Sequence, residues 1–435
     1  ITEDLTTALS QIASLFVIAR NSAFTYKDKA VNVQEVGKEL GVHYVLEGSV
    51  RKANDQVRIT AQLIEATTGY HLWSGQYDRP LKDIFALQDE IVQKITTTLK
   101  LQLTLREQGY LVRKTTNNLE AYDAYLRGIE VLNRYTKETN AQARHLFEKA
   151  VELDPQYAEA YARLSRTLST EWLMAWNQDP LTLERALVVA QKAVALDDSL
   201  PAAHEVLAFV YTYKKQHEQA ITAAKRAIAL APNNAEGYAN LGHTLLFAGQ
   251  PEEVIGVVEK AMRLNPRYPP WYLLDLGQAY YRTGRYAQAI ATLKELISRS
   301  PNYFAPYPLL ALNYVQQWAF QQSPDSQTLE QALAAGQRAI AIDDTVPWSH
   351  WALGAVYLWQ KQYDQALAEM KRTVTLDPNE ALNFATLAEA LSYVGRSEDA
   401  LEAAEQALRL KPFVVDAHLD SVGTAYATAG RPEEA

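Results

Sequence analysis

The chain of 435 residues contains no cysteine. Disulfide bonds, thiolate metal ligands and catalytic thiols are therefore excluded, because each of them needs a cysteine sulfur. This absence fits an oxidising and a reducing compartment equally well. The sequence also lacks a run of about 18 apolar residues, so it predicts no membrane-spanning helix. No stretch has the pattern of a signal peptide.

The short motifs that mark common enzyme sites are missing as well. There is no H-E-x-x-H pair, no G-x-x-x-x-G-K-[ST] loop and no G-x-S-x-G elbow. Of the eight scattered histidines, three recur at one position of a repeat, which favours a scaffold role over metal binding: His204, His350 and His418. Two paired carboxylates fall where other repeats turn: Asp197-Asp198 and Asp343-Asp344. We predict no catalytic, cofactor-binding or metal-binding residue, and we expect that this chain is not an enzyme.

Positive charge is scarce too. The chain has 42 Lys and Arg against 51 Asp and Glu, a formal net charge of −9. Affinity for nucleic acids comes largely from neutralising phosphates with basic side chains. An acidic chain is a poor candidate for that task, so we predict no nucleic-acid partner.

What the sequence does contain is a period, seen most clearly from Trp271 to Pro301. Gly277 and Ala289 provide small residues where two amphipathic helices would cross, and Gly284 provides the turn between them. Pro301 ends the second helix, because proline lacks the N–H that a helix interior needs. One such hairpin cannot bury its own apolar face, so copies of it must stack.

Copies of this pattern follow one another along the chain, most of them at a spacing of about 34 residues. The residue that ends each unit is Pro155, Asp198, Pro232, Pro266, Pro301, Asp344, Pro378 or Pro412. The small residue of the second helix keeps the same register: Ala143, Ala186, Ala220, Val254, Ala289, Ala332, Ala366 and Ala400. This spacing resembles the tetratricopeptide repeat over residues 119–435. The resemblance implies a mainly α fold, an α-α superhelix with eight complete repeats and a truncated ninth.

Two of the repeats are longer than the others, those that end at Asp198 and at Asp344, and their insertions look alike. At one constant offset, Trp172 matches Trp318 and His204 matches His350. We infer that a block of four repeats was duplicated whole. Each insertion is expected to lie between the two helices of its repeat.

The stretch 1–107 has a different pattern. A short apolar run predicts a buried strand at Phe16–Arg20. Alternation and turn signals predict three more strands, at His43–Lys52, Val57–Glu65 and His71–Tyr77. Helices are expected at 2–14, at Val33–Leu40 with Gly41 as its C-cap, and at Leu81–Glu107. We therefore expect a small α/β domain with a mixed sheet at 1–107, followed by a linker at 108–118.

This front domain resembles the TolB amino-terminal-like (FlgO-like) domain. The resemblance is carried by residues 1–5, by the strand 44–50, by the Thr67-Thr68-Gly69 turn and by residues 83–90. It implies a first strand that would precede Ile1, so we expect a fragment of a longer bacterial signalling protein. An adenylate or guanylate cyclase, kinase or winged-helix domain often precedes this module. A sheet edge left open would allow a homodimer through this domain.

The concave groove of the repeats is the candidate site. Aromatic residues fall at the repeat positions that usually face it: Phe209, Tyr213, His243, Phe247, Trp271, Tyr281, Trp348, Trp351, Trp359 and Tyr393. An aromatic groove suits an apolar peptide or helix. The alternative is that these side chains merely pack between adjacent repeats. Asn240 is available for a carboxylate clamp, but the accompanying Lys and Arg are missing, so we do not predict that clamp.

Three hypotheses follow for function. The first is a non-enzymatic interaction and scaffold module that binds a protein or peptide in the groove, including the missing upstream domain. The second is the regulatory C-terminal region of a cyclase or kinase. The third is the sensor half of a winged-helix transcription regulator. We expect a bacterial cytoplasmic location, or a periplasmic one if a membrane span precedes Ile1.

Overall fold

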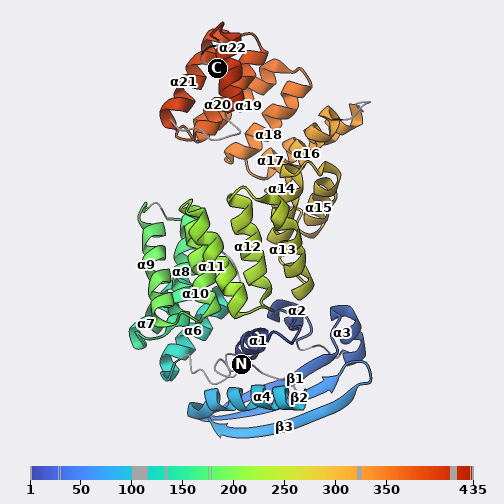
Figure 1. Ribbon diagram of the computed structural model, residues 1–435, viewed down its shortest axis with the longest axis vertical. Helices are drawn as coiled ribbons and strands as arrows, with labels where there is room; N and C mark the ends of the chain where they lie inside the picture. The colour runs from blue at the N-terminus through green and yellow to red at the C-terminus, as the bar shows by residue number, and fades with distance from the viewer. Residues whose placement is uncertain are drawn as a thin grey trace. The chain divides into compact units, whose positions relative to one another are not determined.

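The computed structural model describes residues 2–27, 29, 31–99, 116–132, 136–174, 176–177, 179–320, 326–411, 419–431 and 433 (Figure 1). The chain divides into two compact units, Ile1–Pro269 (unit 1) and Pro270–Ala435 (unit 2). This division falls inside the array of repeats. The predicted linker at 108–118 lies outside the described residues except for 116–118, so the predicted domain limits stay a prediction.

The front domain of unit 1 combines a sheet with short helices. Three strands, β1 (Tyr44–Ala53), β2 (Gln56–Glu65) and β3 (Tyr70–Pro80), pair antiparallel in the order β1-β2-β3. Around them lie α1 (Thr2–Ser10), α2 (Arg20–Phe24), α3 (Val33–Leu40), a 3₁₀ turn (Leu81–Asp83) and α4 (Ile84–Thr98).

The core of the front domain lies between the sheet and α4, which runs along the sheet in Figure 1. Val57 and Ile59 of β2 point to the same face because side chains alternate along a strand. They pack with the apolar stripe of α4, which consists of Ile84, Leu87, Ile91 and Ile95. Each of these six side chains is at most 3% exposed.

Two expectations about the front domain were wrong. The described sheet is antiparallel and not mixed, because its three strands follow one another through short turns. Phe16–Arg20 is not a strand: Phe16 is 46% exposed, and Arg20 begins α2. The backbone N–H of Ala19 instead donates, over 2.9 Å, to the carbonyl of Leu264, which ends the helix α13 (Pro251–Leu264). The apolar run Phe16–Arg20 has the composition of a buried strand, but through Ala19 it contacts the helix repeats instead.

Other front-domain expectations were close. The predicted helix Val33–Leu40 is α3, and Gly41 ends it in the left-handed conformation at φ 66°. The long helix was predicted to reach Glu107, but α4 ends at Thr98, and 100–107 lie outside the described residues. On its outer side β1 pairs with no described strand. The homodimer through this domain stays a prediction.

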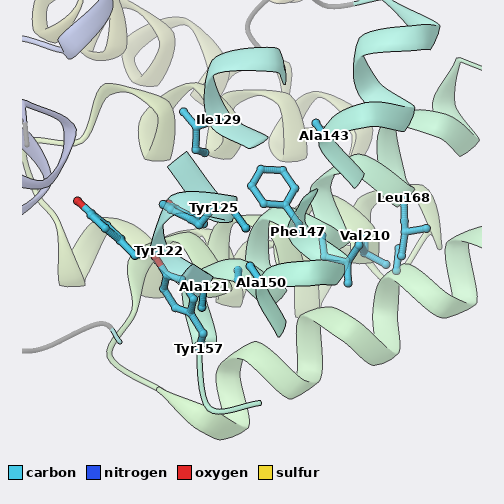
Figure 2. Packing of buried hydrophobic residues seen from close by; sticks show 14 of the residues in the cluster. Ala121, Tyr122, Tyr125, Ile129, Ala143, Phe147, Ala150, Tyr157, Leu168 and Val210 are labelled. Carbon is cyan, nitrogen blue, oxygen red and sulfur yellow. The ribbon is translucent and has the colours of Figure 1, made fainter. Parts of the chain in front are cut away.

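The remainder of unit 1 consists of four helix pairs. Their bounds are α6 (Leu119–Leu132), α7 (Lys137–Leu153), α8 (Ala158–Leu173), α9 (Thr182–Leu196), α10 (Pro201–Tyr213), α11 (His217–Leu230), α12 (Ala235–Phe247) and α13 (Pro251–Leu264). The first pair has an aromatic core, shown in Figure 2, in which the Tyr125 ring lies 5.9 Å from Phe147 and 5.1 Å from Tyr157.

Unit 2 continues the same architecture with four pairs and one further helix. The bounds are α14 (Trp271–Arg282), α15 (Tyr286–Arg299), α16 (Pro306–Ala319), α17 (Ser326–Ile342), α18 (Pro347–Trp359), α19 (Tyr363–Leu376), α20 (Ala381–Tyr393), α21 (Ser397–Leu410) and α22 (Leu419–Thr428). Both insertions fall between the two helices of a pair, as expected, and their described residues form no strand.

The turn inside a helix pair requires a left-handed residue. Gly284 and Gly395 adopt φ 71° and φ 81° at this position. Lys215 and Lys361, which are equivalent in the two blocks, hold the same position at φ 59° and φ 60°. A side chain makes this conformation costly by roughly 1–2 kcal/mol, whereas glycine adopts it freely. The two lysines therefore carry local backbone strain.

Exchanging these residue types should change stability in opposite directions. We expect Lys361→Gly to raise the free energy of unfolding by about 0.5–1 kcal/mol, since the relief of strain exceeds the added freedom of the unfolded chain. We expect Gly395→Ala to lower it by about 1 kcal/mol. Urea denaturation of both variants measures this. A loss of stability in Lys361→Gly would contradict the assignment of strain.

Candidate interaction surface

The first helices of the pairs form the inner side of each unit. Neighbouring first helices contact one another, as α8 does with α10 and α16 with α18, while contacts between neighbouring second helices are sparser. Stacked pairs must then curve toward their first helices, and the concave face is the usual binding surface of a solenoid. The described residues of this face are where the predicted groove should be sought.

In unit 1 the inner side carries a continuous row of rings, which we call the aromatic ladder. It consists of Trp172, Phe209, Tyr213, His243 and Phe247, from α8, α10 and α12. Tyr213 is central: its ring centroid lies 5.5 Å from Trp172, 4.8 Å from Phe209 and 5.5 Å from Phe247. Its hydroxyl also hydrogen-bonds His243 Nε2 at 2.9 Å. These contacts hold the rings in fixed positions.

One ring of the aromatic ladder is buried in the protein, and another is exposed to solvent. Phe209 is buried, and the Arg166 guanidinium lies 4.2 Å from its ring centroid, a cation–π contact. Phe247 is 46% exposed. The structure thus brings together four predicted site residues. Trp172 and Arg166 were missed as site residues, although Arg166 occupies in the preceding repeat the position that Phe209 holds in its own.

Unit 2 repeats part of this arrangement. The Trp318 and Trp359 rings lie 5.6 Å apart at 69°, and the matching Trp172 and Tyr213 rings lie 5.5 Å apart at 60°. Both pairs are related by the offset of the duplication, so the two blocks share this contact. Trp359 is 45% exposed and Tyr393 is 63% exposed. Trp318 was not among the predicted site residues.

The predicted tryptophan face of α18 divides into two parts. Trp359 meets Trp318 at one end of the helix, while Trp348 is half-buried at the other end. The rise of the helix between Trp348 and Trp359 is about 16 Å. Trp351 is half-buried and packs against the core cluster that includes Leu391 and Ala385 of α20. The Trp271 ring lies 4.5 Å from Tyr272, and Tyr281 lies 6.1 Å from Tyr286.

In unit 1, helix α1 of the front domain lies against the first helices of the repeats. The Glu3 carboxylate accepts from Arg20 at 2.5 Å and from Arg163 of α8 at 3.1 Å. The Asp4 carboxylate accepts from the Tyr122 hydroxyl at 2.7 Å and from Gln88 at 2.8 Å. Helix α1 therefore docks on the first helices through its two acidic residues.

The contact continues at the end of α1. The Asn233 backbone N–H donates to the Ser10 carbonyl at 3.1 Å, and its side-chain amide donates to the Ile12 carbonyl at 2.9 Å. The surface that holds α1 in unit 1, which we call the α1 cradle, consists of Tyr122, Glu159, Arg163, Glu205, Asn233 and Glu236. A cavity of about 690 Å³ remains between this cradle and α1.

Two acidic side chains that line this cavity, Glu159 and Glu205, are only partly exposed to solvent. Burial and the nearby Asp4 raise the pKa of Glu159 to about 8. Burial and the nearby Glu236 raise the pKa of Glu205 to about 7. Loss of hydration penalises the charged form, and a neighbouring carboxylate adds to that penalty. These two residues therefore exchange protons near neutral pH.

The histidines and paired carboxylates have structural partners. His204 Nε2 lies 2.7 Å from the Asp198 carbonyl, and His350 Nε2 lies 2.8 Å from the Asp344 carbonyl. Asp197 and Asp343 accept backbone N–H groups two residues ahead, as turn residues do. His418 lies outside the described residues. Within the part of the chain that the structure describes, no three His, Asp or Glu side chains group to hold a metal ion, and no helix is long and apolar enough to cross a membrane.

Comparison with known families agrees with this architecture. Models described as tetratricopeptide repeat match residues 202–234, 223–255, 245–312 and 386–435. These stretches fall on helix pairs of both units. The chain carries tetratricopeptide repeats. No family match covers the front domain among these models, so the TolB-like assignment of that domain stays a prediction.

Similar proteins include one curated relative and several solved structures. "Putative adenylate cyclase 3" of Rhizobium meliloti (strain 1021) is 41% identical over 220 residues, 50% of this chain and 38% of that protein. The chain thus spans well under two thirds of that relative. The crystal structure of the APC/C hetero-tetramer Cut9-Hcn1 has a TM-score of 0.53 at 16% identity, over 79% of this chain and 63% of that one, which shows the tetratricopeptide solenoid fold alone. A thermophilic TPR protein of Thermus thermophilus, TTC0263, is 26% identical with a TM-score of 0.41, over 44% of this chain and 98% of that one.

The raised pKa values predict how stability depends on pH. Between the ordinary carboxyl value of 4.5 and about 8, the folded chain binds more protons at Glu159 and Glu205 than the unfolded chain does. These two groups therefore make the free energy of unfolding fall as pH rises through this window. We expect Glu205→Gln and Glu159→Gln to flatten that fall.

Differential scanning calorimetry from pH 5 to pH 8.5 measures the effect. Glu152→Gln changes an exposed carboxylate of α7 and provides the matched control. It should leave the pH dependence as in the wild type. An equal slope in all variants would show that these two carboxyls ionise in the folded chain as they do in water.

Proposed function

We propose that this chain is a non-enzymatic scaffold module of a bacterial signalling protein, whose tetratricopeptide repeats bind a protein or peptide on their inner side. The aromatic ladder of unit 1 carries this proposal. Aromatic and arginine side chains are the residue types most enriched at the energetic centres of interfaces. The ladder presents them on the concave face, and its top remains open to solvent.

The ladder is also preorganised for binding. Tyr213 contacts three rings and hydrogen-bonds His243, while Arg166 packs on Phe209. Side chains already fixed in the free protein lose little conformational entropy when a partner arrives. Packing between repeats explains the buried Phe209, but it does not account for Phe247, whose ring is 46% exposed. That exposed ring supports binding as the role of the ladder.

Peptides selected by phage display on the whole chain test the proposal. We expect Phe247→Ala to weaken the selected peptides by about 2 kcal/mol, the size of an aromatic anchor. Val188→Ala is the matched control, because Val188 is 65% exposed on the second helix α9, away from the inner side. Binding should be unchanged in this control. Peptides that respond to Val188→Ala and ignore Phe247→Ala would place binding elsewhere.

A second candidate is the regulatory region of a nucleotide cyclase. It is supported by the 41% identity over 220 residues to the Rhizobium meliloti protein named as a putative adenylate cyclase. We propose that a catalytic domain outside this chain would be controlled through the repeats, in the bacterial cytoplasm where its nucleotide substrate is found. The repeats would then serve as its scaffold.

Cyclase assays on two proteins separate this candidate from the first. The chain alone is expected to form no cyclic AMP from ATP. The longer protein encoded by the complete gene should form it, and Phe247→Ala in that protein should change its rate when a selected peptide is added. A longer protein that forms no cyclic nucleotide would remove this candidate and leave the scaffold proposal in place.

A further inference from the structure

The repeats of unit 1 and unit 2 carry different residue types at the position where α1 docks in unit 1. The offset of the duplication relates the second, third and fourth pairs of unit 1 to those of unit 2. For the first pair, the crossing glycines set the alignment: a Cβ at Gly128 would lie 2.6 Å from Phe147, and one at Gly277 would lie 2.9 Å from Leu293. Gly128 and Gly277 are thus equivalent, which makes Tyr122 equivalent to Trp271.

On this alignment five of the six polar groups of the α1 cradle are replaced by apolar residues in unit 2. Tyr122, Glu159, Arg163, Glu205 and Glu236 correspond, in that order, to Trp271, Ala305, Leu309, Trp351 and Leu382. Ala202, beside the cradle, corresponds to Trp348. We call the surface of Trp348, Trp351 and Leu382 the tryptophan cradle. All three side chains are half-buried. Every described helix of unit 2, from α14 to α22, belongs to the repeats, so unit 2 has no described counterpart of α1.

The occupied cradle indicates what the tryptophan cradle would hold. In unit 1 this position receives a helix, α1, whose acidic residues meet the Tyr122 hydroxyl and the Arg163 guanidinium. In unit 2 the equivalents of Tyr122 and Arg163 are Trp271 and Leu309, which offer neither a hydroxyl nor a guanidinium group. An acidic helix would bury its carboxylates there without comparable partners, at a high cost in hydration. A helix that turns an apolar face to this surface removes no charged group from water.

One polar residue of the α1 cradle is retained in unit 2, and it indicates the direction in which a bound helix would run. Asn233 donates its backbone N–H to the carbonyl of Ser10, the last residue of α1, and its side-chain amide to the carbonyl of Ile12, two residues beyond the helix. It corresponds to Asn379, whose backbone N–H donates to the Asp377 carboxylate at 3.2 Å, and each asparagine follows the proline of its repeat turn. The Asn379 side chain is exposed. The last carbonyl groups of a helix lack partners within the helix and accept hydrogen bonds from such donors. Asn379 therefore stands where the C-terminal end of a bound helix would be capped.

We propose that the tryptophan cradle binds an amphipathic helix of a partner protein, with its apolar face on Trp348, Trp351 and Leu382 and its C-terminal end at Asn379. This inference rests on the proposed scaffold function and specifies the class of partner. It also separates two surfaces on α18, since Trp359 at the far end of the helix pairs with Trp318 and lies outside the cradle.

A designed peptide tests the proposal on the whole chain. The probe is a fluorescein-labelled peptide of residues 2–14, made apolar on the side that lines the α1 cavity by Glu3→Leu, Asp4→Leu, Thr7→Leu and Gln11→Leu. Its opposite side, which packs in the front domain, is made polar by Leu5→Lys, Leu9→Lys and Ile12→Lys. The control peptide carries only the three lysine changes. Fluorescence anisotropy should show at least tenfold tighter binding of the apolar peptide.

Variants of the chain then locate the bound peptide. Trp348→Ala and Trp351→Ala should each weaken binding by about 30-fold, as expected of hot-spot residues. Asn379→Ala should weaken it by about two- to tenfold, the effect of one hydrogen bond. The matched controls are Trp359→Ala on the same helix and Phe247→Ala in the aromatic ladder, and both should stay within twofold of the wild type.

The outcomes separate this inference from the proposed function. Equal binding of both peptides, or full affinity in Trp348→Ala and Trp351→Ala, overturns the tryptophan cradle but leaves binding at the ladder untouched. Loss of affinity in Trp359→Ala alone places the peptide at the other end of α18 and also overturns it. If calorimetry shows that Trp351→Ala unfolds at a lower temperature than the wild type, the variants Trp348→Ala and Asn379→Ala decide whether the peptide binds at the tryptophan cradle.

Discussion

The close approach of two helices at a small residue is the constraint on which the whole array depends. The second helix of each pair places one such residue at the crossing, and all eight have no exposed surface: Ala143, Ala186, Ala220, Val254, Ala289, Ala332, Ala366 and Ala400. The first helices contribute glycines, and a Cβ at Gly242 would lie only 2.5 Å from Val258. Larger residues would separate the helices and expose the apolar surface between neighbouring pairs.

Because these crossing positions are fixed, the inner positions of the first helices are free to differ between the two blocks. Unit 1 uses them for a polar cradle that holds its own α1 and for a ladder of rings above it. Unit 2 keeps the Trp318–Trp359 contact that matches Trp172–Tyr213, and replaces the polar cradle by tryptophan and leucine. One scaffold thus carries two surfaces of different chemistry, which is possible because each repeat contacts only its neighbours.

The front domain shows how a local pattern can mislead. Phe16–Arg20 has the composition of a buried strand, but in the structure the Ala19 N–H donates to the carbonyl of Leu264, the last residue of α13. The Ser22 hydroxyl donates to the side chain of the next residue, Asn265, 243 residues away in the sequence. The hairpins of β1, β2 and β3 were predictable because their turns and alternation are local. The docking of α1 was not predictable, since Glu3 and Arg163 are 160 residues apart and no local pattern pairs them.

The sequence by itself determined the repeat architecture, the turn positions and the duplication, because helix crossing depends on residues spaced within one unit of about 34. It also identified most of the aromatic residues of the inner side. Only the tertiary structure decided which of them meet. It joined Phe209, Tyr213, His243 and Phe247 into one ladder with Trp172, and it placed Trp359 apart from Trp348. The reason is physical: ring contacts and hydrogen bonds between repeats depend on the curvature of the stack, which no single repeat encodes.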